Sequence, residues 1–292
     1  MARIVYVNGV YAPYASAVVH AEDRGFQFAD AVYEVCEVRD GLLVDERRHM
    51  ARLQRSLGEL RMAQPMDLRS LGVILRETVR RNRVKNGLVY LQITRGVARR
   101  DFAFPQPDVM PTVVCFARPL SRAKGEKRAG AGISVITLPD IRWTRADIKT
   151  TGLLAQSLAR QQANEAGAYE AWMVDRDGYV TEGASCNAWI VTADGKLVTR
   201  PADFGILRGI TRGVVMDIAR RNGFVFEERA FTVDEAKAAR EAFQTSATGL
   251  VMPVVKIDGE PVGNGKPGEV AVGLRQVYHT VAEISSTPAH LT

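Results

Sequence analysis

The chain has 292 residues, of which 46% are hydrophobic and 25% charged, and 39 basic against 33 acidic side chains give a net charge of +6. This composition excludes a disordered chain, a collagen and a small disulfide-stapled protein, and the length allows one large domain or two of middling size. The basic excess is almost entirely arginine, with 31 arginines and only 8 lysines. An excess this small predicts no nucleic-acid partner.

Nothing in the sequence suggests a membrane or an oxidising compartment. A transmembrane helix needs about 20 consecutive apolar residues, which are absent, and the first residues form a strand pattern instead of a secretory signal. We therefore expect a cytoplasmic protein with no membrane partner. The three cysteines are widely spaced and suit reduced core positions, and the four histidines lack the spacing of metal ligands, so no metal site is expected.

The first third of the chain mixes strand and helix patterns. Residues 4–11 form two short apolar runs around an Asn-Gly pair, and residues 31–44 repeat this arrangement around an Asp-Gly pair, which predicts two hairpins. Asp45 and Asp67 each precede apolar residues at helical spacing, which predicts two capped amphipathic helices. Strand patterns return at residues 88–94 and 112–117, and an irregular loop rich in arginine and aromatic residues separates them.

An abrupt change to small and charged residues marks a domain boundary. Residues 121–132 (SRAKGEKRAGAG) have the composition of an inter-domain connection. The basic run lacks interleaved aromatic residues, so a solvated linker explains it better than a nucleic-acid patch. The sequence thus predicts an N-terminal domain over residues 1–120, a linker over 121–132 and a C-terminal domain over 133–292.

The second half again mixes strands and helices without βαβ alternation. Strands are expected at residues 133–138, 188–192 and 197–199, with a further pair turning at positions 177 and 178. Helices are expected at residues 151–166 and 211–222, each closed by a glycine, after Thr232 in a capping box, and after Gly268. These patterns favour an α+β fold of two domains over a doubly wound sheet.

Among the eight lysines, Lys149 has the most unusual neighbourhood. It lies between an irregular stretch that contains Trp143 and an apolar helix, where its side chain is expected near the interior. A partly desolvated lysine amine becomes a nucleophile that forms Schiff bases. A surface lysine before a helix is the competing interpretation, so the catalytic one requires partner residues.

Three stretches supply candidate partners, each with a plain alternative. Glu182 follows a strand among small residues and suits the acid that keeps a cofactor's pyridine nitrogen protonated, although a turn-flanking surface glutamate is the alternative. The amides of Ile210 and Thr211 open a helix and suit a phosphate, or form an ordinary helix start. Arg52 suits the same phosphate, or is an exposed helix arginine.

Taken together, these stretches resemble the fold type IV pyridoxal phosphate aminotransferases, and most closely the D-amino acid aminotransferases. The resemblance covers essentially the whole chain. The segments that carry it are residues 22–34 (EDRGFQFADAVYE), 49–53 (HMARL), 90–96 (YLQITRG), 147–149 (DIK), 180–183 (VTEG), 207–212 (LRGITR) and 245–248 (TSAT). Each segment is weakly specific alone, and their order along the chain makes the set specific.

The resemblance implies a homodimer with pyridoxal 5'-phosphate between two α+β domains. It implies that Lys149 holds the cofactor as a Schiff base and moves the proton of the substrate carbon, while Tyr33 lines the substrate pocket. The cofactor-binding residues that it implies are Arg52, Lys149, Glu182, Ile210, Thr211, Ser246, Ala247 and Thr248.

One position departs from the family pattern. The family holds the substrate carboxylate with an arginine and, two residues on, a histidine; these places fall on Arg100 and Phe102. Arg100 can still bind a carboxylate in a bidentate manner, but one donor is lost and the pocket becomes more apolar. This leaves room for altered D-amino acid preference or for (R)-amines, which lack a carboxylate.

The expected reaction is a ping-pong transfer of the amino group of a D-amino acid to a 2-oxo acid such as 2-oxoglutarate. A branched-chain L-amino acid aminotransferase and an aminodeoxychorismate lyase share the fold and are alternatives; the residues 90–96 favour the D-amino acid group. A basic protein that binds nucleic acid without a cofactor is a remote alternative from a different class.

Overall fold

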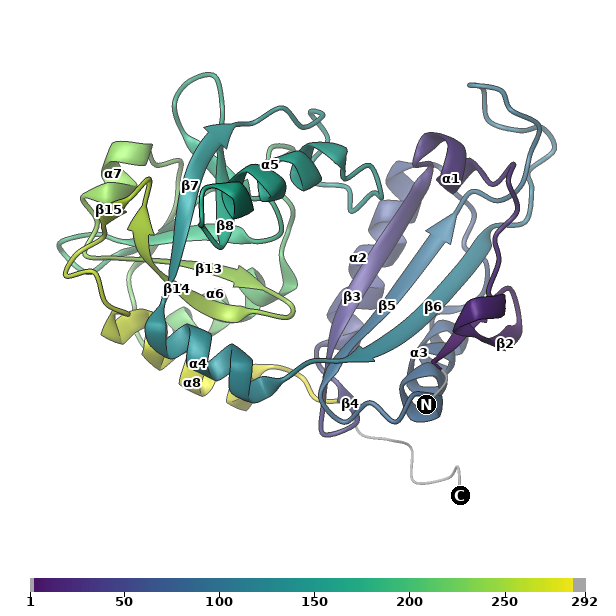
Figure 1. Ribbon diagram of the computed structural model, residues 1–292, viewed down its shortest axis with the longest axis horizontal. Helices are drawn as coiled ribbons and strands as arrows, with labels where there is room; N and C mark the ends of the chain where they lie inside the picture. The colour runs from purple at the N-terminus through teal and green to yellow at the C-terminus, as the bar shows by residue number, and fades with distance from the viewer. Residues whose placement is uncertain (1–2, 286–292) are drawn as a thin grey trace. The chain divides into compact units, whose positions relative to one another are not determined.

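The computed structural model describes residues 3–285, and its chain forms two compact units (Figure 1). Unit 1 contains the chain up to Ser121, the short segment Ile148–Gly152 and the chain from Glu283 onward. Unit 2 contains Arg122–Asp147 and Leu153–Ala282. Within the described residues, no helix has the length and apolar character needed to cross a membrane.

Unit 1 is an antiparallel sheet with helices on one face. Its six strands lie in the order β2-β1-β6-β5-β3-β4. Their bounds are β1 Ile4–Val7, β2 Val10–Pro13, β3 Ala31–Arg39, β4 Leu42–Leu43, β5 Gly87–Thr94 and β6 Thr112–Pro119. The helices are α1 Arg24–Phe28, α2 Glu46–Glu59 and α3 Leu68–Arg81, with a 3-10 turn at Tyr14–Ser16.

The core of unit 1 forms between the sheet and the apolar faces of α2 and α3. Leu53 and Leu57 of α2 and Leu71 and Leu75 of α3 are all buried, as the helical spacing predicts. Residues of β3 alternate between the helix-covered face and the opposite face, so neighbouring side chains on this strand meet different surroundings.

Helices α2 and α3 start directly after Asp45 and Asp67, as predicted, but only Asp67 makes the predicted capping bond. Asp67 accepts a hydrogen bond from Ser70 N at 2.9 Å and caps α3. Asp45 precedes α2 but has a left-handed backbone (φ 56°) and makes no capping bond to the helix. Its carboxylate instead accepts a hydrogen bond from Glu283 N at 3.0 Å, so this acid joins the C-terminal segment to unit 1.

Unit 2 is a nine-stranded mixed sheet flanked by helices. The order is β12-β11-β10-β13-β14-β7-β8-β9, with β15 on β14. The strands are β7 Ile133–Pro139, β8 Glu170–Val174, β9 Val180–Gly183, β10 Asn187–Val191, β11 Leu197–Thr199, β12 Phe226–Glu228, β13 Glu241–Ser246, β14 Leu250–Ile257 and β15 Glu260–Pro261. The helices are α4 Arg122–Ala131, α5 Leu154–Glu165, α6 Ile210–Arg221, α7 Val233–Lys237 and α8 Glu269–Val281.

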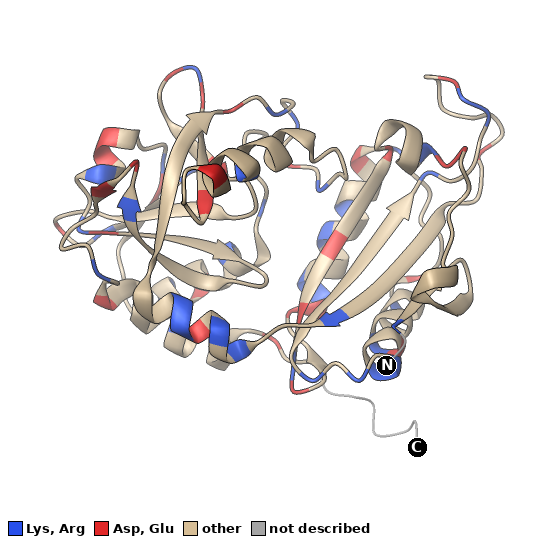
Figure 2. Ribbon diagram, in the orientation of Figure 1, with Lys and Arg blue, Asp and Glu red and all other residues tan. Residues whose placement is uncertain are grey.

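The segment predicted as a linker, residues 121–132, is mostly helical in the structure. It forms α4, which carries several charged side chains (Figure 2) and groups with unit 2. Ala129 is buried against the unit 2 core, and Glu126 pairs with Arg275 of α8 at 2.9 Å. Small and charged residues suit a one-sided surface helix as well as a linker, and these tertiary contacts favour the helix.

Other starts and ends of unit 2 helices follow from local chemistry. Thr232 accepts a hydrogen bond from Glu235 N and caps α7, and Gly223 ends α6 with a positive φ of 70°, both as predicted. Helix α5 begins at Leu154 instead of residue 151, because residues 148–152 lie along β3 of unit 1. Thr150 bridges to Val32 there.

Candidate functional site

The predicted nucleophile lies in the short segment that pairs with β3. Tyr33 N donates to Lys149 O at 3.0 Å, and Thr151 N donates to Ala31 O at 3.1 Å, so backbone bonds on both sides fix the position of Lys149. Its side chain is partly buried, and its Nζ lies 4.2 Å from the centre of the Tyr33 ring. Within residues 3–285 this amine makes no hydrogen bond or ion pair. The structure thus brings Lys149 and Tyr33 together.

Tyr33 begins a row of aromatic side chains across the sheet. Its ring stacks on Tyr90 at 5.5 Å between centroids, and Tyr90 stacks on Phe116 at 4.7 Å. The Tyr90 hydroxyl donates to Gln92 at 2.8 Å, and burial raises the pKa of this phenol above its ordinary value. The sequence analysis did not single out Tyr90 or Phe116; the strand alternation of β5 and β6 was the available signal, because cross-strand register places them side by side.

Arg52 is buried in an ion-pair cluster, not exposed on its helix. Its Nε and Nη2 donate to both oxygens of Glu34 at 2.8 and 2.7 Å, and His49 Nδ1 lies 2.7 Å from the same carboxylate. Burial opposes ionisation of Glu34, but the Arg52 charge and hydrogen bonds outweigh it and lower the Glu34 pKa to about 2. Tyr33 and Glu34 are adjacent on β3, so Lys149 and Arg52 contact neighbouring residues of this strand.

The loop that carries the predicted carboxylate arginine is exposed but anchored. The Arg100 guanidinium lies 5.3 Å from the Phe28 ring and 5.8 Å from the Phe102 ring, and Phe102 is 81% exposed. Buried Arg24 donates to Asp101 O at 2.6 Å and to Ala103 O at 3.3 Å. Arg24 therefore holds the backbone of this loop, a role that the sequence analysis did not assign.

Arg24 is itself fixed by a shared carboxylate. Asp30 accepts from Arg24 Nε at 2.8 Å and from Arg95 Nε and Nη2 at 2.7 and 3.0 Å. Both arginines and the aspartate are within the segments 22–34 and 90–96 that carry the family resemblance. The cluster therefore joins these two segments, and through Arg24 it supports the loop.

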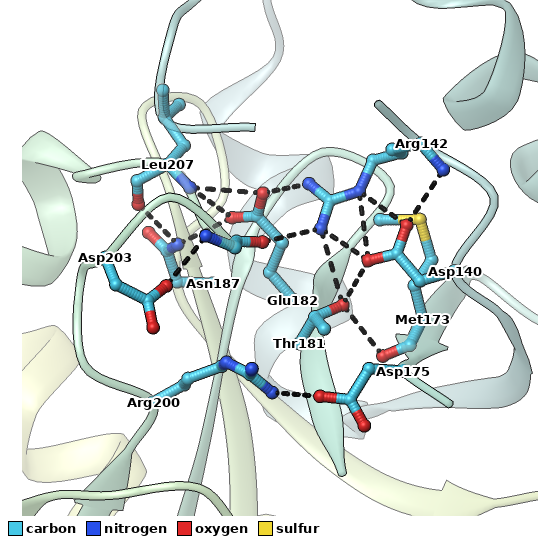
Figure 3. A network of polar contacts seen from close by, with 11 residues as sticks. Asp140, Arg142, Met173, Asp175, Thr181, Glu182, Asn187, Arg200, Asp203 and Leu207 are labelled. Carbon is cyan, nitrogen blue, oxygen red and sulfur yellow. Dashed lines mark hydrogen bonds and ion pairs between the residues drawn. The ribbon is translucent and has the colours of Figure 1, made fainter. Parts of the chain in front are cut away.

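In unit 2, Glu182 is the centre of a network of polar contacts (Figure 3). Its carboxylate accepts from Arg142 Nη1, from Asn187 Nδ2 at 2.8 Å and from Leu207 N at 3.2 Å. The glutamate lies at the end of β9 and is 6% exposed, so it is not the surface residue of the alternative interpretation. These three donors hold the buried carboxylate in one orientation.

The network connects Glu182 to the start of α6. Asn187 donates to Leu207 O at 2.9 Å, and a Cβ on Gly209 would lie 2.0 Å from Asn187 Oδ1, so only glycine fits there. The first backbone bond of α6 joins Gly213 N to Gly209 O, which leaves the amides of Ile210 and Thr211 outside the helical ladder. No acidic residue lies in the first turn, so this helix end favours an anion.

The second predicted phosphate loop follows β13. Ser246 Oγ accepts from Gly249 N at 3.1 Å, and Ala247 and Thr248 form the turn between them. Arg275 Nη1 donates to Gly249 O at 2.7 Å and to Val251 O at 2.8 Å. The arginine of α8 therefore braces the turn, and Ser246 and Ala247 remain partly exposed and Thr248 exposed.

Each unit thus carries chemistry that suits an enzyme acting on amines. Unit 1 holds a partly buried amine against an aromatic ring, and unit 2 holds an anchored carboxylate beside a helix start that favours an anion. Taken unit by unit, the Lys149 amine suits an aldehyde in unit 1, and in unit 2 Glu182 suits a ring nitrogen and the start of α6 suits a phosphate.

Comparisons with known proteins give the family. Residues 31–257 match the family model of amino-transferase class IV. The chain is 38% identical over 283 residues to the D-alanine aminotransferase of Staphylococcus haemolyticus, covering 97% of this chain and 99% of that protein. It is 40% identical to the D-alanine aminotransferase of Bacillus licheniformis over 264 residues, covering 90% and 92%.

A solved structure agrees with this match. The branched-chain amino acid aminotransferase of Escherichia coli has a TM-score of 0.88 at 25% identity and covers 96% of this chain and 95% of its own. The chain belongs to the class IV aminotransferase family and has its two-domain α+β fold, which confirms the resemblance seen in the sequence.

Proposed function

We propose that this aminotransferase transfers the amino group of a D-amino acid to a 2-oxo acid such as 2-oxoglutarate, with pyridoxal 5'-phosphate as cofactor. The observation that supports it best is the 36–40% identity to D-alanine aminotransferases over nearly the full chain. The segment 90–96, which favours the D-amino acid group, contributes Arg95 to the cluster that fixes Arg24, and the segment 147–149 contributes Lys149.

Each chemical group of the cofactor has a candidate partner in this chain. Lys149 would supply the amine that binds the cofactor's aldehyde, and Glu182 the acceptor for its ring nitrogen. The amides of Ile210 and Thr211, the turn at Ser246–Thr248 and the Arg52 guanidinium are the candidate phosphate ligands. When bound, pyridoxal phosphate withdraws electrons from the carbon that bears the amino group.

Proton transfer and substrate binding would depend on side chains of the protein. The Lys149 amine, once released, would take the proton from the substrate carbon and return it, and the Tyr33 ring would line the pocket on that side. Arg100 would bind the substrate carboxylate. Phe102 stands where the family has a histidine and would give the carboxylate no hydrogen bond. The proposal therefore includes (R)-amines, which lack a carboxylate, as further amino-group donors.

A chiral donor screen tests this proposal. The purified protein should show a visible absorption band of bound pyridoxal phosphate and should convert D-alanine, but not L-alanine, with 2-oxoglutarate as acceptor. Activity with L-leucine instead of D-alanine would favour the second candidate, a branched-chain L-amino acid aminotransferase, which the structural likeness to such an enzyme supports. Release of pyruvate from aminodeoxychorismate without an acceptor would indicate the lyase.

We also propose that the protein is a homodimer. Large apolar side chains of unit 2 are exposed, among them Ile141 at 64%, Leu154 at 75% and Phe204 at 62%. Exposed apolar groups of this size commonly mark protein contacts. Light scattering after gel filtration should give twice the mass of 32.1 kDa, and a mass of one chain at micromolar concentration would contradict the dimer.

A further inference from the structure

The network around Glu182 contains a second acid that does not touch Glu182. Asp140, just after β7, accepts from Arg142 Nη2 at 2.7 Å and from Arg142 Nε at 3.0 Å (Figure 3). Arg142 uses its remaining nitrogen, Nη1, on Glu182. The three side chains therefore form an acid–arginine–acid chain, and their side-chain exposed fractions are 13%, 4% and 7% in that order.

Further hydrogen bonds hold this chain of side chains in place. Thr181 Oγ1 donates to Asp140 at 2.7 Å, and Arg142 Nη2 also donates to Gly205 O at 3.0 Å. Thr181 and Glu182 are neighbours on β9, so one strand contacts both ends of the arrangement. Burial raises the pKa of the Asp140 carboxyl, but the Arg142 hydrogen bonds and charge lower it more, so Asp140 stays ionised.

The charges of these three groups sum to −1, because two carboxylates share one guanidinium. An arginine paired with Glu182 alone would give a sum of zero, and a neutral pair is a poor partner for a protonated ring nitrogen. Opposite charges weaken each other's action on a third group, and they do so strongly where water is excluded. Asp140 thus offsets the arginine that holds Glu182.

We propose that Asp140 is a positioning residue that balances the charge of Arg142, so that Arg142 orients Glu182 without cancelling its action on the cofactor's ring nitrogen. The inference rests on the proposed function, in which Glu182 is the partner of that nitrogen. Asp140 would act on Glu182 only through Arg142, because Arg142 contacts both carboxylates.

The experiment uses the holoenzyme loaded with pyridoxal phosphate carrying nitrogen-15 in the ring. The nitrogen chemical shift reports ring protonation directly. Asp140→Asn keeps the size and the acceptor oxygen for Arg142 but removes the charge. We expect its shift to move toward that of the unprotonated ring and its half-reaction with D-alanine to slow about threefold to tenfold, with KM nearly unchanged.

A matched control and a charge-restoring variant separate charge balance from mere structure. Asp175 pairs with Arg200 at 2.6 Å in the same unit and does not contact Glu182 in the described part of the chain (Figure 3), so Asp175→Asn should leave the nitrogen shift as in the wild type. Asp140→Glu restores the charge that Asp140→Asn removes, keeps Arg142 on Glu182, and should recover the wild-type shift. A purely structural role predicts that Asp140→Glu, with its longer side chain, moves the shift as much as Asp140→Asn does.

The outcomes are distinguishable from failure of the proposed function. A wild-type protein without a bound-cofactor absorption band, or with a ring nitrogen shift that Glu182→Gln does not change, contradicts the role of Glu182 itself. A normal wild type in which Asp140→Asn matches Asp175→Asn overturns only the inference about Asp140. Should Asp140→Asn fail to fold, Asp140→Ser removes the same charge and still decides, because a wild-type shift in that variant would overturn the charge balance.

Discussion

The two units prepare their key side chains in opposite ways. In unit 2, Glu182 accepts hydrogen bonds from Arg142, Asn187 and Leu207, and its position is set before anything binds. In unit 1, the backbone around Lys149 is fixed by two strand bonds, but its amine meets only the face of the Tyr33 ring among the described residues. Hydrogen bonds thus fix the Glu182 carboxylate, whereas no hydrogen bond within the described residues fixes the Lys149 amine.

This difference matches the tasks proposed for the two groups. A partner of a ring nitrogen acts by its charge, and charge acts best from a fixed position in a site that excludes water. A group that first binds a cofactor and then carries a proton must reach different atoms, so a long side chain on a fixed backbone suits it.

The first prediction removes the mobile group. Lys149→Ala should lower turnover about 10⁴-fold and abolish the visible band that borohydride reduces, because no other amine takes its place. Steady-state assay and absorption spectra measure both effects. Lys196→Ala, a lysine paired with Asp194 and Glu227 on the surface, is the control and should behave as the wild type. A coloured and active Lys149→Ala would remove Lys149 from the mechanism.

The second prediction removes the charge of the fixed group. Glu182→Gln should slow the half-reaction about 10²-fold while the amide keeps most of the contacts, because the loss is electrostatic. Stopped-flow spectroscopy gives the rate, and thermal melting checks the fold. Glu260→Gln, which removes the exposed partner of the surface residue Lys237, should change neither. Equal rates for Glu182→Gln and wild type would show that the anchored carboxylate is not used.

The third prediction concerns the buried cluster behind β3. The pKa of Glu34 is lowered from 4.5 to about 2 in the folded chain, so its ionisation stabilises the fold above pH 4.5, and this stability is lost as pH falls toward 2. The shift corresponds to about 3 kcal/mol. Glu34→Gln should lower the free energy of unfolding in urea at pH 7 by about that amount. Its free energy of unfolding should also fall less steeply as the pH is lowered.

Glu59→Gln is the control for this stability measurement. Glu59 pairs with Arg55 on the partly exposed side of α2, the helix that carries Arg52. Such a pair contributes under about 1 kcal/mol to stability. If Glu34→Gln were no less stable than Glu59→Gln at pH 7, the Glu34–Arg52 pair would add nothing to the fold, and Arg52 would need no acid to hold it.

The fourth prediction concerns the exposed loop. Arg100→Ala should raise KM for D-alanine about tenfold or more, and should change KM for a simple (R)-amine little, because only the amino acid offers a carboxylate. Arg99→Ala, beside it in the same loop, is the matched control. Equal effects of Arg100→Ala on both donors would remove Arg100 from the carboxylate site.

The sequence carried enough information for the fold class and for many element boundaries. Asp67, Thr232 and Gly223 end or begin helices as predicted, because their effects are local. Asp45 does not make the predicted capping bond, because its carboxylate accepts a hydrogen bond from Glu283 N, near the other end of the chain. Composition likewise suggested a linker at residues 121–132, and the helix there is favoured by tertiary contacts with α8 and with the unit 2 core.

The site shows the same division between local and distant information. Lys149 and Glu182 stood out by their neighbours in sequence, and the structure buries both at least in part. Asp140 was not predicted, because Arg142 connects it to Glu182, which is distant in sequence. Arg24 and Tyr90 lie in segments that carry the resemblance, but their contacts with the loop backbone and with Tyr33 were not predicted. Their roles depend on tertiary register, which spacing along one chain does not specify.

The segment Ile148–Gly152 has a consequence for how this protein can be divided. The chain passes from one unit to the other after Ser121, Asp147, Gly152 and Ala282. No single cut therefore yields two complete units, and a fragment ending at Ser121 would lack the strip that pairs with β3. An exchange of domains between relatives would have to transplant three separate pieces of unit 1, and the smallest of them carries the lysine.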